Sequence, residues 1–542
     1  MSISSDLPCT AIAQIDFTVG DISGNRDKII AAWNKASDDG AQIVIFPELC
    51  VTGYPPEDLI LMPEFRTQAM KAVRDIAAAT KDGAAVIIGS VLEEDGKIYN
   101  AALLLDSGNI VHVQRKIMLP NYGIFDEKRL FSTGNSHKIA LWRDYKVGIL
   151  ICEDIWDQSF EKDLRDQGVD IIFVINASPF EVGKYERRIE VAKKVVSITG
   201  CSLLYVNLVG GQDDIVFDGG SFALNSKGEV TNSFPQFAEG IFTINNYMKL
   251  SSENTLPLNQ RDDNWLIWQV MKLGLYDYVR KNGFSEVLLG LSGGIDSAVT
   301  AVLAADALGS DNVLGVLLPS PYNSKGSVDD AKVLADMIGI RTITVPISSA
   351  MRTFDEMLTP HFGRESWIEE AEIGGNLQAR LRAVVLMGLS NSYGSLLLST
   401  GNKSEIAVGY STLYGDSCGA YNVLKDLYKT KVYELANWRN SVATAIPESV
   451  ISKPPSAELK PEQKDTDNLP PYEILDDILE KYIEKAMSAA EIIAAGHEAS
   501  TVEKILKLVR ISEYKRRQSC PGVKISSMLF GRDRRYPITN KF

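Results

Sequence analysis

The chain has 542 residues, more than the roughly 250 to 300 at which a single hydrophobic core stops growing, so we expect two domains. Apolar residues make up 45% and charged residues 23% of the sequence, which excludes an intrinsically disordered chain. The formal net charge of −14 argues against a protein that coats nucleic acid or an anionic membrane, although it does not exclude a local pocket for small anions.

The N-terminus and the cysteines bear on the cellular compartment. The start, MSISSDLPCT, has no basic and apolar signal segment, and the longest apolar runs have strand length. We therefore expect neither secretion nor a membrane span. The six cysteines are far apart and form no Cys-x-x-Cys pair, which argues against a zinc cage or a redox dithiol. A reducing, cytoplasmic location is expected.

Short runs of Val, Ile and Leu alternate with longer segments up to about residue 245. Continuous apolar strands of this kind are buried on both faces, which indicates a layered α/β domain. We expect this first domain to span 1–250. Its expected strands are 10–17, 41–48, 84–93, 100–106, 145–154, 168–178 and 201–210, and helical spacing occurs in 25–39 and 64–80.

Three of these apolar runs end in a residue that can take part in chemistry. Cys152 is either a small core residue or a reactive thiol displayed at a strand end. Glu48 and Lys116, each taken alone, are more often solvated charges at the rim of a sheet. Together the three supply the parts for amide hydrolysis. Glu48 can take the thiol proton, Cys152 can attack the amide carbon, and Lys116 can offset the charge that develops on oxygen.

These residues occur in the contexts FPELCVTGYPPEDL, RKIMLPNYGIFDEKRLF and ICEDIWD. In order and context they resemble the Glu-Lys-Cys triad of the nitrilase (carbon–nitrogen hydrolase) superfamily. The resemblance covers about residues 8–245 and implies an αββα sandwich. It also implies that Glu127 is a second glutamate beside the triad.

A narrower resemblance is to the glutaminase version of that fold. It implies that glutamine is held by Tyr122, Glu153, Ser178 and Lys184. Without the resemblance, Tyr122 is a packed aromatic residue and Ser178 a turn residue just as readily as ligand contacts.

The pattern breaks at the polar segment SSENTLPLNQRDDN, 251–264, which we interpret as a linker to a second domain at 265–542. Strands and helices alternate again beyond it, as in a doubly wound, Rossmann-like domain with a parallel sheet that binds a nucleotide. The expected elements are a helix at 264–284, a strand at 286–292, a helix from about 296, and strands at 312–319 and 341–347.

The segment SGGIDS, 292–297, follows an expected strand and opens an expected helix. Glycines let the backbone approach an anion closely, and a helix N-terminus presents free N–H groups to it. A plain strand-to-helix turn is the alternative. The segment lacks the lysine and spacing of a Walker loop. It resembles the PP-loop of the N-type ATP pyrophosphatases, which release pyrophosphate from ATP and adenylate a substrate oxygen.

Further motifs narrow this resemblance. Asn376 and Arg380 are four residues apart and lie on one face of an expected helix. They either contact a ligand or form part of a solvated stripe of the helix. NLQARLR, STGNKSE, GYSTLYGD, LKDLYKTKVYELA and FGRDRRYPI, together with SGGIDS, resemble the NAD synthetase family. With the first domain, the chain from about residue 8 to 542 is similar to the glutamine-dependent branch of that family.

The resemblance implies a homo-oligomer and a set of binding residues. Magnesium is expected at Asp296 and Glu405, and deamido-NAD at Asn376, Glu405 and Lys515. ATP is expected at Gly290, Leu291, Ser292, Gly293, Gly294, Ile295, Asp296, Ser297 and Thr400.

The implied reaction has two parts. Glutamine acylates Cys152 and releases ammonia, while ATP adenylates the nicotinate carboxylate of deamido-NAD; ammonia then displaces AMP. Two alternatives remain: another glutamine-dependent adenylating amidotransferase, and a non-catalytic assembly protein that keeps both folds. Residues 514–542 carry eight Lys or Arg and one acid, so this tail is our candidate for a basic anion site in an acidic chain.

Overall fold

The protein is represented by a computed structural model that describes residues 8–157, 161–245, 262–362, 371–456, 458–460 and 463–540. The chain divides into two compact units, Met1–Asp262 and Asp263–Phe542. Of the predicted linker only 262–264 are described, and helix α6 (Asp263–Lys281) begins there.

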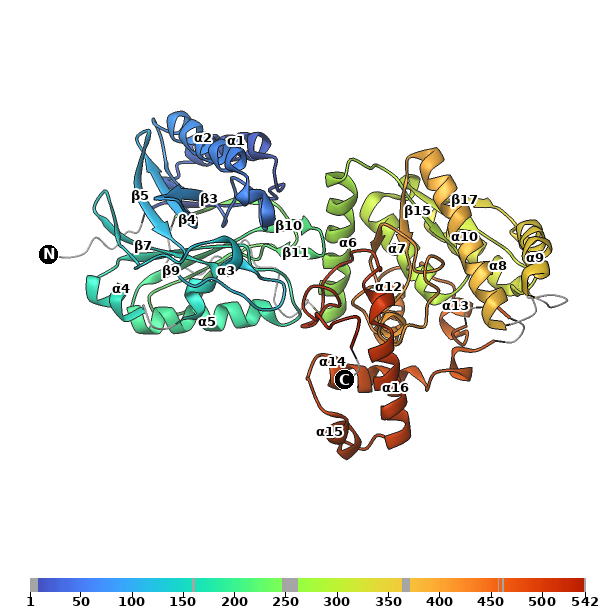
Figure 1. The fold of residues 1–542 in the computed structure, drawn as a ribbon. Helices are drawn as coiled ribbons and strands as arrows, with labels where there is room; N and C mark the ends of the chain where they lie inside the picture. The colour runs from blue at the N-terminus through green and yellow to red at the C-terminus, as the bar shows by residue number, and fades with distance from the viewer. Residues whose placement is uncertain are drawn as a thin grey trace. The chain divides into compact units, whose positions relative to one another are not determined.

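Two mixed sheets form the centre of the first unit (Figure 1). One has the strand order β14-β1-β2-β3-β4-β5, the other β13-β12-β9-β8-β7-β6, and β10 and β11 form a separate hairpin. The strands of the first sheet are β1 (Thr10–Gln14), β2 (Ile43–Ile45), β3 (Ala85–Glu94), β4 (Lys97–Asp106), β5 (Asn109–Arg115) and β14 (Gly240–Ile244). The remaining strands are β6 (Ala140–Trp142), β7 (Tyr145–Ile151), β8 (Ile171–Asn176), β9 (Ser202–Asn207), β10 (Val209–Gln212), β11 (Ile215–Asp218), β12 (Phe222–Leu224) and β13 (Val230–Ser233).

Helices cover the outer face of each sheet, so the unit has four layers, as Figure 1 shows. The alternation of side chains along a strand explains this arrangement. In β8, Phe173 and Ile175 pack against the first sheet, whereas Ile172 and Val174 pack toward α5. The predicted αββα sandwich is confirmed. The helices are α1 (Ile22–Asp38), α2 (Pro63–Ala79), the short α3 (Glu127–Leu130), α4 (Glu161–Gln167) and α5 (Lys184–Thr199).

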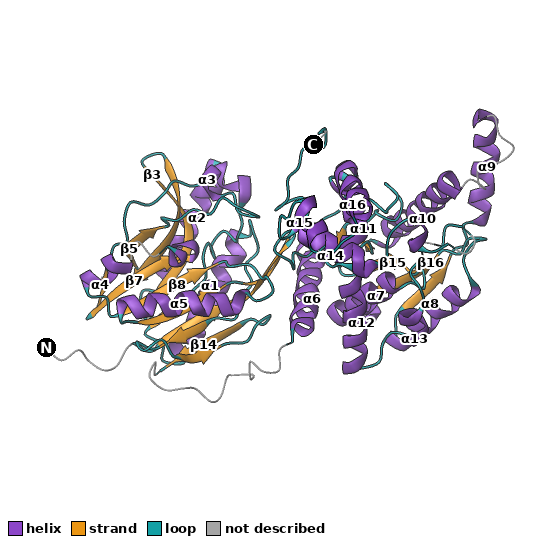
Figure 2. Cartoon of the chain, turned by 90° about the horizontal axis from the view of Figure 1, so that it is seen from below, coloured by secondary structure: helices purple, strands orange, loops and turns teal. Residues whose placement is uncertain are grey.

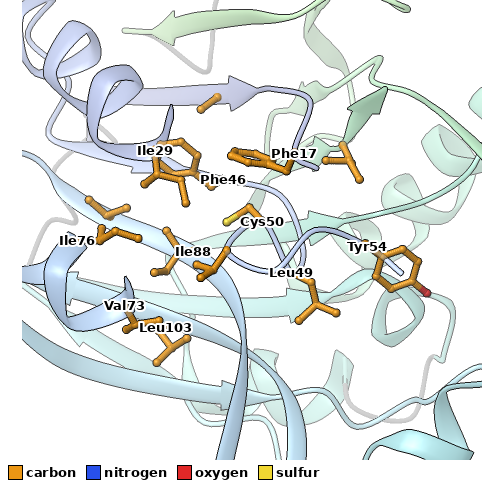
Figure 3. Close-up of a cluster of buried hydrophobic side chains, with 14 of the residues drawn as sticks. Phe17, Ile29, Phe46, Leu49, Cys50, Tyr54, Val73, Ile76, Ile88 and Leu103 are labelled. Carbon is orange, nitrogen blue, oxygen red and sulfur yellow. The ribbon is translucent and has the colours of Figure 1, made fainter. Parts of the chain in front are cut away.

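The core between α1, α2 and the first sheet extends to the chain segment that carries Glu48. Phe17 and Phe46 meet edge to face with ring centroids 6.5 Å apart (Figure 3). Tyr54 lies at the edge of this cluster, and its hydroxyl donates to Glu127 Oε1 at 2.8 Å. The apolar layer therefore ends directly at a buried carboxylate.

The second unit contains a parallel sheet with the order β17-β16-β15-β18-β19. Figure 2 shows β15 and β16 between α10 on one side and α7 and α8 on the other. The predicted doubly wound domain is confirmed. The strand order reverses between β15 and β18, and in such sheets ligands bind beyond the carboxyl ends of the strands at this switch point. The strands are β15 (Val287–Gly290), β16 (Val313–Leu317), β17 (Arg341–Thr344), β18 (Leu396–Ser399) and β19 (Tyr421–Asn422).

A smaller helical layer completes the second unit, with its own apolar core formed by residues such as Ile406, Leu475 and Ile505. Its helices follow those that flank the sheet. In chain order the helices after α6 are α7 (Ile295–Leu308), α8 (Lys325–Ile338), α9 (Ser348–Phe362), α10 (Ala371–Tyr393), α11 (Lys403–Val408), α12 (Lys429–Val442), α13 (Glu448–Ser452), α14 (Tyr472–Ile483), α15 (Ala489–Ala494), α16 (Ala499–Ile511) and α17 (Glu513–Arg516). Within the described ranges, no helix is both long and apolar enough to cross a bilayer.

Candidate active sites

The first candidate site lies where three strands of the first unit end. Glu48 comes shortly after β2, Lys116 directly after β5, and Cys152 directly after β7, where it opens a 3₁₀ helix. Cys152 has a φ of +47°, in the left-handed region that non-glycine residues rarely adopt. Such a conformation costs on the order of 1–3 kcal/mol and is typical of functional sites.

A buried ammonium group connects two buried carboxylates at this site. Lys116 Nζ lies 2.7 Å from Glu48 Oε1 and 2.9 Å from Glu127, and all three side chains are at most 5% exposed. Glu48 also accepts from Asn100 Nδ2 at 2.7 Å and from the Ala177 N–H at 2.9 Å. Because every partner is itself buried, the carboxylate of Glu48 is held in one position.

The charges of these groups determine the state of the thiol. Burial and the nearby charge of Glu48 raise the pKa of Cys152 well above its ordinary value, although Lys116 opposes the shift. Burial raises the pKa of Glu127 to about 7. Burial opposes the charged form of Lys116, but Glu127 and Glu48 outweigh it and raise its pKa. The resting site therefore contains a protonated thiol beside a carboxylate that can accept its proton.

The four residues expected to hold glutamine differ in their surroundings. The Tyr122 hydroxyl donates to Glu153 Oε1 at 2.9 Å on a partly exposed surface. Ser178 is buried, and its hydroxyl accepts from Arg188 Nε at 3.1 Å. Lys184 is the first residue of α5 and is half-buried.

Arg188 is a buried residue that the sequence analysis missed. Its guanidinium pairs with Asp218 at 2.8 Å and donates to the carbonyls of Ser178 and Pro179 at 2.8 and 2.9 Å. One side chain thus shapes the loop that carries Ser178. Nothing in the local sequence distinguishes this arginine from its exposed neighbour Arg187.

The second candidate site is a cavity of about 280 Å³ in the second unit, beyond the ends of β15 and β18. Apolar and polar side chains from several helices line it. The predicted site residues that line it are Gly290, Leu291, Ser292, Gly294, Ile295, Asp296, Ser297, Thr400, Glu405 and Lys515.

The glycine-rich loop is shaped by close backbone packing. Gly293 has a φ of +78°, and a Cβ atom there would lie 2.2 Å from the carbonyl oxygen of Ser327 in α8. Only glycine avoids both the strain and the clash. Gly294 caps α7 without a side-chain hydrogen bond, so the first turn of this helix retains N–H groups for an anion.

A second buried lysine lies beside this loop. Lys429 Nζ forms an ion pair with Asp296 and lies 3.2 Å from Glu405 Oε1. Asn402 caps α11 and donates from Nδ2 to Asp296 Oδ1 at 3.0 Å. Burial raises the pKa of Glu405 to about 8. Lys429 and Asn402 are not among the residues predicted from the sequence, although Asn402 forms an N-x-x-E capping pattern with Glu405.

Asp296 and Glu405 also have the chemistry expected of a magnesium site. No cluster of three or more His, Cys, Asp or Glu side chains suited to a metal occurs among the residues the structure describes. Proteins, however, commonly bind Mg²⁺ with one or two carboxylates and substrate phosphates. Two acidic side chains that a buried ammonium holds beside a glycine-rich loop fit that pattern.

Two residues predicted to contact deamido-NAD, Lys515 and Asn376, differ in whether they line this cavity. Lys515 lines the cavity, and its Nζ donates to the carbonyls of Gly409 and Ser411 at 2.8 and 2.7 Å. Asn376 is not among the residues that line the cavity in the described part of the chain; it accepts from Thr412 Oγ1 at 2.8 Å.

Several basic residues of the tail form ion pairs within the fold. Lys524 forms a buried ion pair with Asp533 at 2.6 Å. Arg516 reaches the cavity, but its guanidinium is bonded to Glu513. The candidate anion contact in the tail therefore narrows to Lys515.

Comparison with known proteins matches both halves of the chain. The carbon–nitrogen hydrolase family matches residues 9–248, and the NAD synthase family matches residues 267–519. Glutamine-dependent NAD(+) synthetases from Synechocystis sp. and Acinetobacter baylyi are 43% and 45% identical to this chain, each over 98% of both sequences.

A solved structure supports the same assignment. The glutamine-dependent NAD+ synthetase from Acinetobacter baumannii, in complex with ADP, is 42% identical, covers 98% of both chains and has a TM-score of 0.78. The enzyme of the same name from Cytophaga hutchinsonii has a TM-score of 0.82 at 22% identity, which shows a shared fold. With near-complete coverage at above 40% identity, this chain belongs to the family of glutamine-dependent NAD(+) synthetases.

Proposed function

We propose that the chain converts deamido-NAD to NAD by ATP-dependent amidation, using ammonia released from glutamine, with AMP, pyrophosphate and glutamate as the other products. The observation that carries this assignment is the presence in one chain of a buried Glu48–Lys116–Cys152 site and a glycine-rich phosphate loop at a sheet switch point. Family membership makes it an enzyme of this type and disfavours both alternatives left by the sequence.

In the first unit, Cys152 is the nucleophile of the glutaminase reaction. Glu48 accepts the thiol proton as sulfur attacks the amide carbon of glutamine, and Lys116 stabilises the charge that develops on oxygen. Ammonia leaves, and water releases glutamate from the thioester. Glu127 keeps Lys116 charged and oriented through their 2.9 Å contact.

Glutamine has two charged ends that the surrounding residues can complement. Glu153 matches the α-amino group and Lys184 the α-carboxylate. Tyr122 orients Glu153 through its hydrogen bond. Ser178 lies in the loop between β8 and α5 and accepts from Arg188.

In the second unit, the loop at 290–297 and Thr400 bind ATP, while Asn376, Glu405 and Lys515 contact deamido-NAD. The nicotinate carboxylate attacks the α-phosphate and pyrophosphate leaves; ammonia then displaces AMP. Asp296 and Glu405 would hold Mg²⁺, which supplies positive charge to the phosphate oxygens when bound. Lys429 holds both carboxylates in place beside the loop.

A single substitution tests the division between the units. Cys152→Ala should abolish NAD formation from glutamine and leave NAD formation from ammonium salts intact, because only the first reaction needs the thiol. Cys201→Ala, another buried cysteine of the same unit, is the matched control and should keep both activities. Loss of both activities in Cys152→Ala would contradict the proposal.

The alternative, another glutamine-dependent adenylating amidotransferase, is tested by comparing the acids that support pyrophosphate release. Pyrophosphate release should depend on deamido-NAD and not on amino acids or purine precursors offered in its place. The homo-oligomeric state and the cytoplasmic location remain predictions.

A further inference from the structure

A buried carboxylate, Asp154, connects two strand ends of the glutaminase site. Its Oδ1 accepts from the backbone N–H groups of Ile117 and Met118 at 3.0 and 2.8 Å. Its Oδ2 accepts from the Ile151 N–H at 3.1 Å. The side chain therefore bonds to the residues that directly follow Lys116 and to the residue that directly precedes Cys152.

The surroundings of Asp154 are unusual for a structural carboxylate. The residue is completely buried, and no ion pair joins its side chain to a cation within the described ranges. Burial raises the pKa of Asp154 to about 7, against the effect of the three N–H groups and of the charge on Lys116. Burying a carboxyl group without a paired cation is costly, and the backbone bonds are what offset that cost.

These bonds span the two features on which amide cleavage depends. Cys152 lies between Ile151 and Asp154 in a left-handed conformation that must be held by its neighbours. The ammonium of Lys116 is held by Glu48 and Glu127, and its backbone bonds to Asn100 and Gly134. Asp154 adds two further bonds, to the N–H groups of the next two residues.

We propose that Asp154 is a positioning residue for glutamine cleavage, which fastens the strained turn of Cys152 to the strand end that carries Lys116. It touches neither substrate nor reacting atoms. This proposal rests on the glutaminase function of the first unit. Without the carboxylate, the backbone next to Cys152 is no longer bonded to the backbone next to Lys116. A misplacement of the reacting groups by about 1 Å can lower the rate of the chemical step about 100-fold.

The test compares Asp154→Asn with Asp106→Asn in the full chain. Asp106 lies in the same unit and accepts from Trp142 Nε1 at 3.1 Å, a bond that an asparagine oxygen can retain. In Asp154→Asn, an NH₂ group faces backbone donors. We expect kcat for glutamine hydrolysis to fall about 100-fold, with an unchanged KM for glutamine and unchanged NAD formation from ammonium. Asp106→Asn should match the unsubstituted protein.

A second measurement separates positioning from loss of folding. Iodoacetamide should alkylate Cys152 more slowly in Asp154→Asn at fixed pH, because the thiolate fraction depends on Lys116 being held near the sulfur. The proposal is overturned if kcat equals that of Asp106→Asn. It is also overturned if kcat falls only in proportion to the folded fraction while alkylation of that fraction is unchanged. Failure of the glutaminase function itself has a different signature, since Cys152→Ala would then still use glutamine.

Discussion

Beside each candidate site, a buried lysine lies between two carboxylates. In the first unit Lys116 contacts Glu48 and Glu127, and in the second Lys429 contacts Asp296 and Glu405. In each case burial opposes the charged lysine and the carboxylates outweigh it, so the pKa of the lysine is raised.

The difference lies in what faces the lysine. Lys116 is enclosed by protein, and the small cavity beside Glu127 has a volume of only about 20 Å³. Lys429 lines the 280 Å³ cavity beside the phosphate loop. The same arrangement thus lies in a closed site in one unit and beside an open cavity in the other, where the proposed function places a nucleotide and Mg²⁺.

Removing each lysine is the strongest way to test this comparison. Lys116→Met should destabilise the first unit by about 3–5 kcal/mol, because Glu48 and Glu127 lose the cation that they share in a closed site. Lys429→Met should destabilise the second unit less, because water can reach Asp296 and Glu405 through the cavity that both of them line. Calorimetry of both variants measures the two costs. Equal costs would contradict the difference in enclosure.

The phosphate loop offers a test with a matched control. Gly293→Ala places a Cβ atom 2.2 Å from Ser327 O, so the loop must move and NAD formation from ammonium should fall about 100-fold. Gly283→Ala has a similar φ of +80° but no atom within 4 Å, and should keep this activity. Glutamine hydrolysis should persist in both. Equal activity of the two variants would show that the clash with Ser327 does not control the loop.

The next test concerns the hydrogen bonds by which the C-terminal tail supports the helix that carries Glu405. Ser526 donates to Asp426 Oδ1 at 3.0 Å and accepts from Lys403 Nζ at 2.7 Å, and Lys403 opens the helix that carries Glu405. Ser526→Ala should cost about 1–3 kcal/mol of stability and weaken ATP-dependent turnover without affecting glutamine hydrolysis. Ser527→Ala, at an exposed hydroxyl 3.5 Å from Glu484, is the control and should change neither. Chemical denaturation and both activities provide the readout.

A further test concerns the pH dependence of stability. Burial raises the pKa of Glu127 from 4.5 to about 7, so the folded state binds this proton more tightly than the unfolded chain. Its stabilising contribution is complete below about pH 4.5 and is lost as the pH rises to about 7. Glu127→Gln has no such proton, so it should gain stability relative to the unsubstituted protein across this range. If the difference in melting temperature between Glu127→Gln and the unsubstituted protein did not change with pH, the raised pKa of Glu127 would be contradicted.

Local patterns predicted the parts of each site that lie at strand ends. Glu48 and Cys152 follow apolar runs, and the loop at 292–297 joins a strand to a helix, so short stretches of sequence were enough to locate them. The expected helices at 25–39 and 64–80 agree with α1 and α2 within a few residues. The short strands β10 to β13 were not predicted, because each has too few residues for a clear alternation and depends on its partner strand.

The missed residues share a different property. Lys429 and Asp296 are 133 positions apart, and Asp154 reaches Ile117 across 37 positions. Contacts of this kind leave no periodic signal, because their energy arises only after folding has removed water from both partners.

The sequence by itself determined two α/β domains, a thiol–carboxylate–ammonium set and a glycine-rich anion loop, since those depend on residue type and local spacing. It also suggested that the basic tail offsets the chain's net charge of −14 at an anion site. Only the tertiary structure showed that Lys524 is paired with Asp533, whereas Lys515 reaches the cavity. Whether a charge is paired or available depends on which distant groups folding buries beside it.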